Sequence, residues 1–314
     1  MEYYFAPMEG LTDSVYRRLH HKYFSGVDKY YMPFFSPTVH RSLTEREARE
    51  LPLADSESFT AVPQLLTKSA EDFLWAARQC ADRGYGEVNL NLGCPSGTVF
   101  SKGKGSGMLR DPDGLERFLD AIFASSPLPI SLKTRLGVED SEEFERLLEI
   151  YNRYPVSLLI VHPRVQKEFY KGTVHRDAFD RALEAYPGTL VYNGDLFTPS
   201  DIGMFCRQYP QVTAVMMGRG LMTDPSLLRQ TRGGRPASRQ ELAAFHDRLL
   251  ALYAARLSGD TPVLHRMREL WNYLSGSFEG TDRPLKAIRK AKDLPAYEAA
   301  AQEILRSCPL KDTK

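Results

Sequence analysis

The sequence predicts an α/β fold, a TIM (β/α)8 barrel followed by a small C-terminal helical bundle. Short apolar or β-branched runs recur between longer segments with helical periodicity, which is the pattern of repeated βα units. Eight such runs are present, and eight parallel strands close a barrel. The runs are residues 3–8, 29–34, 60–66, 87–92, 130–134, 158–162, 190–193 and 214–217.

The segments between these runs carry helix start signals. Ser69 precedes an amphipathic stretch, and Asp111 and Thr198 each precede a proline, so all three are N-cap candidates. Residues 36–58 are polar and charged without strand character, and we expect a long loop there. Long loops on a barrel often shape access to its mouth.

The pattern changes after residue 217, because no further strand run appears. Gly233, Gly234 and Pro236 indicate a boundary, beyond which the segments are amphipathic at helical spacing. We therefore expect two domains, a catalytic barrel over residues 1–235 and a helical domain over residues 236–314.

Charge is distributed unevenly along the 314 residues, although the formal net charge is only +1. The last 82 residues carry 14 Lys and Arg against 10 Asp and Glu, while the rest of the chain carries 27 against 30. This basic composition could follow a phosphate backbone, but a solvated helix face would look the same. The basic and aromatic residues concerned are His265, Arg266, Arg268, Trp271, Tyr273, Arg283, Lys286, Arg289, Lys290 and Lys292.

The four cysteines are far apart and form no CxxC pair, so neither a disulfide framework nor a metal site is expected. Cys80 and Cys206 lie at helical spacing and are interpreted as core residues, whereas Cys308 carries no pattern. No uncharged run approaches the length of a membrane span, and the N-terminus has no targeting pattern. We expect a cytoplasmic protein that has no membrane partner.

Polar residues follow nearly every predicted strand. Because active sites of TIM barrels form at the carboxyl ends of the strands, these residues should meet at one rim. They are Pro7, Met8 and Glu9, Gln64, Asn91 and Cys94, Lys133 and Arg135, His162 and Arg164, Asn193, Gly194 and Asp195, and Gly218 with Arg219.

The last two strands end in NGD and GRG, and barrels commonly hold a phosphate on these two loops. Arg219 would be the charged clamp, although plain turns would have the same sequence. Lys133 would point into the barrel mouth, beside N1 and the C2 carbonyl of a flavin. A Schiff-base lysine of an aldolase or a buried ion pair would also explain Lys133. His162 could bind flavin or phosphate, or be structural.

Cys94 follows a strand directly and lies between Gly93 and Pro95, which places its thiol at the rim and outside the core. A thiol with a reference pKa of about 8.5 is largely protonated at neutral pH, so it can act as a general acid. The following SKGKGSGML run fails the spacing of a phosphate-binding P-loop and of a dinucleotide fingerprint. We expect a flexible loop over the barrel mouth.

Taken together, APMEGLTD, NLNLGCP with KGKGSGML, LKTRLG, NGD and MMGRG resemble the tRNA-dihydrouridine synthase family, in the expected order from residue 6 to about residue 220. The resemblance implies an FMN-containing barrel, NADPH as reductant, tRNA as partner, and a helical domain that helps to hold the tRNA. It differs from the usual family pattern at Glu9, where a small residue is common, and at Pro163, where glycine is usual.

Residue by residue, the resemblance makes Cys94 the proton donor, and Asn91, Arg135 and Lys102 contacts of the substrate. The implied reaction moves hydride from reduced FMN to C6 of a uridine, in the D-loop, and a proton to C5. Alternatives are a flavin-dependent dehydrogenase of free pyrimidines, an aldolase and an RNA-binding protein without activity. The implied FMN contacts are Pro7, Met8, Glu9, Gln64, Lys133, His162, Asn193, Gly194, Asp195, Gly218 and Arg219.

Overall fold

The computed structural model describes residues 1–37 and 40–311, which divide into two compact units. Each unit is made of segments that are separate in the sequence. The barrel unit comprises Met1–Pro7, Asp28–Gly194 and Tyr209–Met216, and the helical unit comprises Met8–Val27, Asp195–Gln208 and Met217–Lys314.

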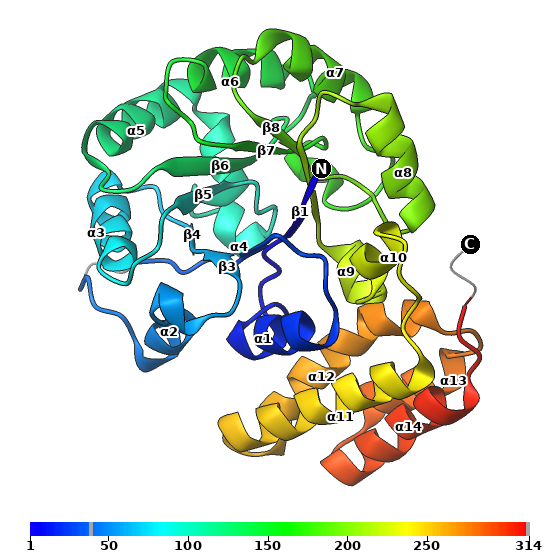
Figure 1. The fold of residues 1–314 in the computed structure, drawn as a ribbon. Coiled ribbons are helices and arrows are strands. Elements are labelled where there is room, and N and C mark those ends of the chain that lie inside the picture. Colours follow the sequence, from blue (N-terminus) through cyan, green and yellow to red (C-terminus); the bar gives the residue numbers. More distant parts are fainter. Residues whose placement is uncertain (38–39, 312–314) are drawn as a thin grey trace. The chain divides into compact units, whose positions relative to one another are not determined.

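Nine parallel strands form the barrel, in the order β3-β2-β1-β9-β8-β7-β6-β5-β4 (Figure 1). The predicted fold class is confirmed, and each predicted run contains a strand. The bounds are β1 Glu2–Phe5, β2 Lys29–Tyr31, β3 Thr60–Val62, β4 Gln64–Leu65, β5 Val88–Leu92, β6 Ile130–Arg135, β7 Leu159–His162, β8 Leu190–Tyr192 and β9 Ala214–Met217.

The ninth strand arises because the third predicted run is divided at Pro63. Its first half, β3, pairs with β2, and its second half, β4, pairs with β5. Proline has no N–H group and interrupts a ladder of backbone hydrogen bonds. The two ends of the strand order are thus one residue apart, which brings the sheet round on itself. The expected count of eight strands is corrected to nine for this reason.

Helices lie outside the strands of the barrel unit, as Figure 1 shows for α5, α6 and α7. The predicted N-caps are confirmed: Ser69 Oγ accepts from Asp72 N at 3.3 Å, and Asp111 Oδ1 accepts from Gly114 N at 2.9 Å. The bounds are α3 Ala70–Ala81, α4 Gly97–Phe100, α5 Pro112–Ser125, α6 Glu143–Tyr151 and α7 Arg176–Ala185.

The long loop expected over residues 36–58 contains regular structure, so that expectation is corrected. Helix α2 (Glu45–Glu50) and a 3-10 turn, η1 (Ala54–Ser56), lie within it. Helix α2 begins with a capping box, in which Thr44 Oγ1 accepts from Glu47 N at 3.2 Å and the Glu47 carboxylate accepts from Thr44 N at 2.9 Å. This reciprocal pair stabilises a helix that has no buried residue. Residues 38 and 39 lie outside the described part of the chain.

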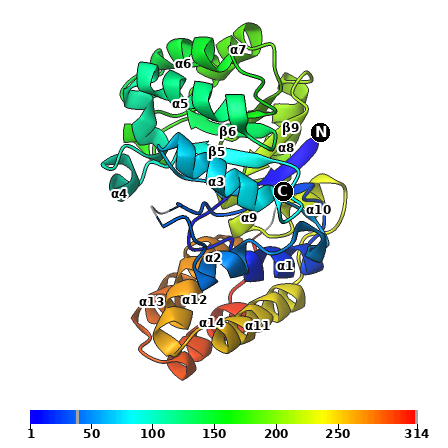
Figure 2. The same ribbon diagram turned by 90° about the vertical axis from the view of Figure 1, so that its left-hand side faces the viewer.

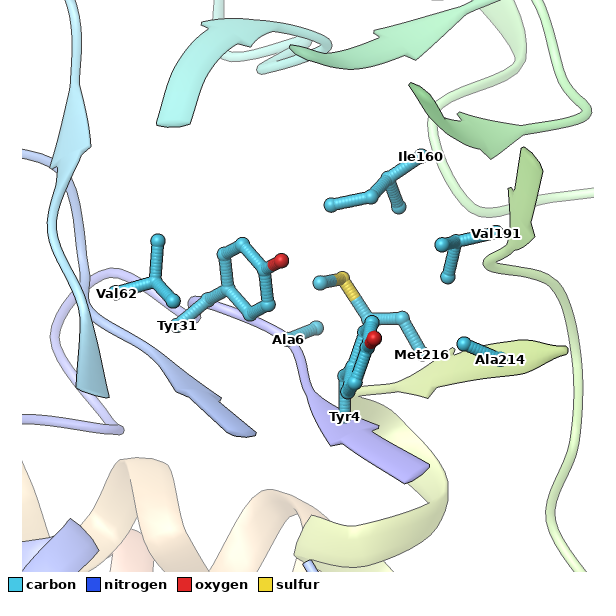
Figure 3. Close-up of a cluster of buried hydrophobic side chains, with 8 residues drawn as sticks. All are labelled: Tyr4, Ala6, Tyr31, Val62, Ile160, Val191, Ala214 and Met216. Atoms are coloured by element: carbon cyan, nitrogen blue, oxygen red, sulfur yellow. The ribbon is translucent and has the colours of Figure 1, made fainter. Parts of the chain in front are cut away.

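The core of the barrel is a cluster of buried side chains that come from, or directly follow, six strands (Figure 3). Tyr4 and Ala6 show the two-residue alternation expected of a strand with one face inward. Burying one large apolar side chain stabilises a fold by roughly 1.5–3 kcal/mol, so the cluster is a main source of barrel stability. Its members are Tyr4, Ala6, Tyr31, Val62, Ile160, Val191, Ala214 and Met216.

The helical unit contains the four C-terminal helices, which lie together in Figure 2, and four shorter elements from earlier in the chain. Helix α1 packs against α11, α9 against α12, and α13 against α14. Thr198 caps α8 as predicted, accepting from Asp201 N at 3.0 Å. The bounds are α1 Ser14–Tyr23, α8 Pro199–Gln208, α9 Arg219–Thr223, α10 Leu227–Thr231, α11 Arg239–Arg256, α12 Asp260–Leu274, α13 Asp282–Lys290 and α14 Leu294–Ser307.

The four cysteines are free thiols. Cys80 is buried as predicted, and Cys308 is buried too. The expectation of a core position is wrong for Cys206, which is partly exposed because the buried stripe of α8 consists of Ile202 and Phe205. None of the described helices is long and apolar enough to cross a membrane.

Candidate active site

The loop after β5 holds Cys94 through the side chain of Asn91. The Asn91 Oδ1 atom accepts hydrogen bonds from Gly93 N at 3.1 Å and from Cys94 N at 2.9 Å. An asparagine that binds backbone N–H groups two and three residues ahead fixes a tight turn. Cys94 is partly exposed, whereas Cys80 is fully buried. The turn therefore presents the Cys94 thiol at the end of the strand.

A chain of buried amides lies behind this turn. Asn91 Nδ2 donates to Gln64 Oε1, Gln64 Nε2 donates to Asn89 Oδ1, and Asn89 Nδ2 donates to Ser131 Oγ, each at 2.8 Å. These four residues, which we name the amide chain, join β4, β5 and β6. Each amide fixes which way the next one points, so the acceptor end of Asn91 faces the Cys94 turn.

The segment after Cys94 folds back onto it. Ser106 donates to the Cys94 carbonyl oxygen from its backbone N at 3.2 Å and from its Oγ at 2.7 Å. Gly105 has a φ of +58°, and a Cβ atom on it would lie 3.0 Å from Cys94 Cβ. Only glycine fits such a left-handed, crowded position without strain. The expected flexible loop is instead α4 and a 3-10 helix, η2 (Gly105–Arg110), with exposed Lys102 in the turn between them.

Lys133 lies on β6 beside Asn91 of β5 in the strand register. Burial, and to a smaller extent the neighbouring Arg135 guanidinium, lower the pKa of Lys133 to about 7, while the negative charge of a Cys94 thiolate opposes this shift. Among residues 1–37 and 40–311, no acidic side chain pairs with Lys133, so the buried ion pair considered above is not found there. A lysine of this kind suits a negatively polarised ligand, or a Schiff base.

Arg135 holds three loop carbonyl groups together. Its guanidinium is buried and donates to Gly93 O at 2.9 Å, to Val165 O at 3.0 Å and to Phe169 O at 2.7 Å. These bonds use the guanidinium to hold the loops, and the substrate contact that the resemblance implies for Arg135 stays a prediction. A buried guanidinium must satisfy its fixed fork of donors, and backbone carbonyls do so here.

His162 at the end of β7 is held by two residues of the loop that follows. Its Nε2 atom lies 3.2 Å from Arg164 Nη1, and its ring stacks on Tyr170 with centroids 6.0 Å apart. Because arginine can only donate, His162 Nε2 is the acceptor, and its proton is on Nδ1 when the ring is neutral. The sequence prediction missed Tyr170, although an exposed aromatic residue in the polar KEFYKG loop could have indicated it.

The residues that follow β8 and β9 are divided between the two units. In the barrel unit, Asn193 Nδ2 donates to Met216 O at 2.8 Å. In the helical unit, Arg219 pairs with the Asp195 carboxylate and lies over the Phe197 ring at 5.3 Å. The expected phosphate clamp, Arg219, thus already has an acidic partner. Met8 N donates to Thr12 Oγ1 at 2.9 Å in a turn that also contains exposed Glu9.

The structure brings together five of the predicted residues in the barrel unit. Gln64, Asn91 and Cys94 are joined by hydrogen bonds, and Lys133 and Arg135 follow on the adjacent strand. Met8, Glu9, Asp195, Gly218 and Arg219 belong to the helical unit. The barrel edge alone thus combines a partly exposed thiol, a partly buried lysine and a network of fixed amides, which defines a barrel enzyme.

Comparisons with known proteins agree with this class. A morphinone reductase mutant solved in complex with tetrahydroNAD has the same fold, with a TM-score of 0.54 at 10% identity over 78% of this chain and 90% of that one. The family model "Dihydrouridine synthase (Dus)" matches residues 4–307. The chain therefore belongs to the dihydrouridine synthase family, and it is a flavin-dependent oxidoreductase.

Named relatives cover almost the whole chain. The tRNA-dihydrouridine(16) synthase of Ralstonia nicotianae is 30% identical over 92% of this chain and 91% of its own length. The protein of the same name from Cupriavidus necator is 28% identical over 92% of this chain and 93% of its own length. Membership of this family decides against the aldolase alternative for Lys133.

Proposed function

We propose that this chain reduces a uridine in the D-loop of tRNA to dihydrouridine, with FMN as cofactor and NADPH as the reductant. The observation that carries the proposal is the partly exposed Cys94, whose backbone N–H donates to Asn91 and whose carbonyl oxygen accepts from Ser106. The names of the relatives supply the substrate class. The tRNA partner, the position of the uridine and the choice of NADPH are parts of this proposal.

The chemistry of two residues in the barrel unit, Lys133 and His162, fits FMN. Lys133 is a partly buried cation for which the described residues supply no acidic partner, and it suits the electron-rich N1 and C2 carbonyl edge of a flavin. The His162 Nδ1 donor is likewise suited to a cofactor oxygen. We assign FMN contacts in this unit to Pro7, Gln64, Lys133, His162, Asn193 and Gly194. Those expected at Met8, Glu9, Asp195, Gly218 and Arg219 rest on the family resemblance.

Bound FMN supplies the hydride, which the C5–C6 double bond of uracil accepts at C6 because this bond is conjugated to the C4 carbonyl. The remaining proton goes to C5, and we assign it to Cys94 Sγ as general acid. Donation leaves a thiolate, and the charge interaction between Cys94 and Lys133 stabilises this thiolate when Lys133 is protonated. Asn91 and Arg135 act as positioning residues for the Cys94 turn.

We assign the substrate contacts to donor groups that face no partner in the bonds described above. Asn91 Nδ2 has a second N–H that can reach the uracil, and exposed Lys102 can reach the RNA backbone. A uridine must leave its stack to reach a barrel mouth, which costs a few kcal/mol that contacts elsewhere must offset. We assign part of that contribution to the exposed basic residues of α13 and the turn after it. These are Arg283, Lys286, Arg289, Lys290 and Lys292.

Three residues of the predicted basic stretch have other partners. Arg266 and Arg268 donate to the backbone carbonyls of Gly10 and Ala291. Trp271 is buried and donates to Tyr297 Oη at 2.8 Å, so it is not available to stack on a base. Within this basic stretch, the proposed RNA contacts are therefore limited to the exposed basic residues of α13 and the turn after it.

The test is formation of dihydrouridine in unmodified tRNA with NADPH. We expect Cys94→Ala to lower the product-forming rate by ~10²–10⁴-fold, the usual contribution of a general acid, while the flavin stays bound. Cys206→Ala, at the other partly exposed cysteine, is the matched control and should keep the wild-type rate. Equal turnover of free uridine would instead assign the chain to free pyrimidines. Full activity of Cys94→Ala would remove Cys94 from the mechanism.

A further inference from the structure

Three lysines lie around the Cys94 loop. They are Lys68, after β4, and Lys102 and Lys104, between α4 and η2. Within residues 1–37 and 40–311, none of the three forms an ion pair. Lys104 is partly buried, and its Nζ atom donates to Ser36 Oγ at 2.7 Å. Surface lysines are commonly solvated or paired, so a partly buried ammonium held only by a hydroxyl group needs a cause.

The three lysines lie around one turn. Gly103 separates Lys102 from Lys104 with a φ of +66°, and Lys68 Nζ lies 3.7 Å from the place where a Cβ atom on Gly103 would be. Burial lowers the pKa of Lys104, Asp72 opposes the shift, and the positive charges of Lys102 and Lys68 lower it further. Like charges are therefore gathered here, which costs free energy unless an anion joins them.

The nearby acidic residues compensate the charge of this cluster only in part. Glu71 and Asp72 on α3 both pair with Arg41, Asp72 Oδ1 at 3.6 Å from Arg41 Nε. Arg41 thus compensates part of the charge of these two carboxylates. The cluster keeps a positive charge, which suits an anionic ligand with several acceptor oxygens, such as a phosphate group.

The lysine cluster is attached to the loop that holds Cys94. Gly107 N donates to Lys104 O at 3.0 Å, and Ser106, between them, donates twice to the Cys94 carbonyl. A ligand bound by Lys104 is therefore coupled to the backbone that positions the thiol. A phosphate that belongs to the same polymer as the reacting base would therefore help to position that base against the thiol.

We propose that Lys68, Lys102 and Lys104 form a phosphate subsite for the RNA backbone, binding a phosphodiester next to the uridine that is reduced. This inference rests on the proposed function and adds to it the contact that positions the substrate strand against the Cys94 loop. The alternative ligand for these lysines is a phosphate group of the dinucleotide reductant. The experiment distinguishes this phosphate from that of the RNA backbone.

The experiment compares the salt dependence of tRNA binding for the wild type and for the double variant Lys68→Gln/Lys104→Gln. Each phosphate contact contributes about 0.7–0.9 to the slope of log K against log salt. We expect the slope to fall by about 1 and the Kd to rise roughly tenfold in the variant. The variant Lys68→Arg/Lys104→Arg keeps both charges and should keep the slope, which tests whether the positive charge itself binds the phosphate.

The matched control is Arg146→Gln/Arg181→Gln, which removes two positive charges from α6 and α7. Both arginines are exposed and paired with acidic residues, so the slope and Kd should stay at the wild-type values. Flavin reduction by NADPH without tRNA is measured for every variant. An unchanged tRNA slope in Lys68→Gln/Lys104→Gln overturns the subsite, and so does a raised KM for NADPH with unchanged tRNA binding. If the wild type forms no dihydrouridine, the proposed function fails, while the binding slopes still decide the subsite.

Discussion

Two buried polar networks, one in each unit, differ in where they end. In the barrel unit the amide chain, from Ser131 to Asn91, ends at the backbone N–H of Cys94. In the helical unit His246 Nε2 lies 2.6 Å from Tyr297 Oη, which also accepts from Trp271 Nε1 at 2.8 Å. That network ends at Asp247 and Gln302 on the exposed surface.

The two networks also differ in how their charges are compensated. A hydrogen bond from His246 lowers the pKa of Asp247, which satisfies the one charge that the helical network reaches. Lys133, beside the amide chain, has no such partner among the described residues. A network in which every polar group has a partner stabilises a fold. An unpaired charge next to a positioned thiol lowers the stability of the fold and is suited to a catalytic role. The difference separates a structural network from a functional one.

The largest effect is expected for the positive charge of Lys133. The pKa of Lys133 is about 7 when folded and near 10.5 when unfolded, so between these values the unfolded chain binds more protons. The unfolding free energy of the flavin-free protein should therefore rise with pH from 7 to 10.5. Lys133→Met should be more stable than the wild type by roughly 2–4 kcal/mol at pH 6, and the difference should shrink by pH 9.5. Urea unfolding at both pH values measures this, and a difference independent of pH would contradict it.

The next effect tests the functional end of the amide chain. Asn91→Ala frees the N–H groups of Gly93 and Cys94 from their acceptor, and misplacing a reacting group by about 1 Å costs on the order of 10²-fold in rate. Asn91→Asp keeps the acceptor for the turn and loses both Nδ2 donors, the one to Gln64 and the one proposed for the uracil, so it should retain more activity than Asn91→Ala, which loses the acceptor as well. Single-turnover formation of dihydrouridine ranks the two variants. Equal rates would show that Asn91 does not act through the turn.

The third change tests the structural network. Tyr297→Phe leaves the Trp271 N–H and His246 Nε2 buried without their partner, at a cost of about 1–3 kcal/mol in unfolding free energy. The rate of dihydrouridine formation should stay at the wild-type value at a temperature where the variant is folded. A slower reaction with unchanged stability would reverse the roles assigned to the two networks.

The smallest effect is expected where the helical network reaches solvent. The Asp247 side chain is 55% exposed, and exposed ion pairs contribute about 0–1 kcal/mol. Asp247→Asn keeps an acceptor for His246 and should lower the unfolding free energy by less than about 1 kcal/mol. Chemical denaturation beside Tyr297→Phe gives the comparison. A loss as large as that of Tyr297→Phe would mean that the charge, and not the buried hydroxyl, stabilises the network.

Local patterns in the sequence predicted the fold well, because strand runs and helix caps depend on neighbouring residues. Ser69, Asp111 and Thr198 cap their helices as predicted. The capping box of Thr44 and Glu47 was equally visible in the sequence but was overlooked within a polar segment. Pro63 gave the reason for the divided strand, yet only the pairing of its two halves with different neighbours revealed it.

The sequence by itself determined the barrel, the thiol after β5, the lysine of β6 and, through ordered motifs, the family. Tertiary structure decided which donor faces which acceptor. Arg135 binds three carbonyls from loops distant in the chain, and Lys68 reaches the Gly103 turn 35 residues away. Motifs record which residue types are present, but the partner of a charged or amide group depends on long-range packing and on the need to satisfy buried polar atoms.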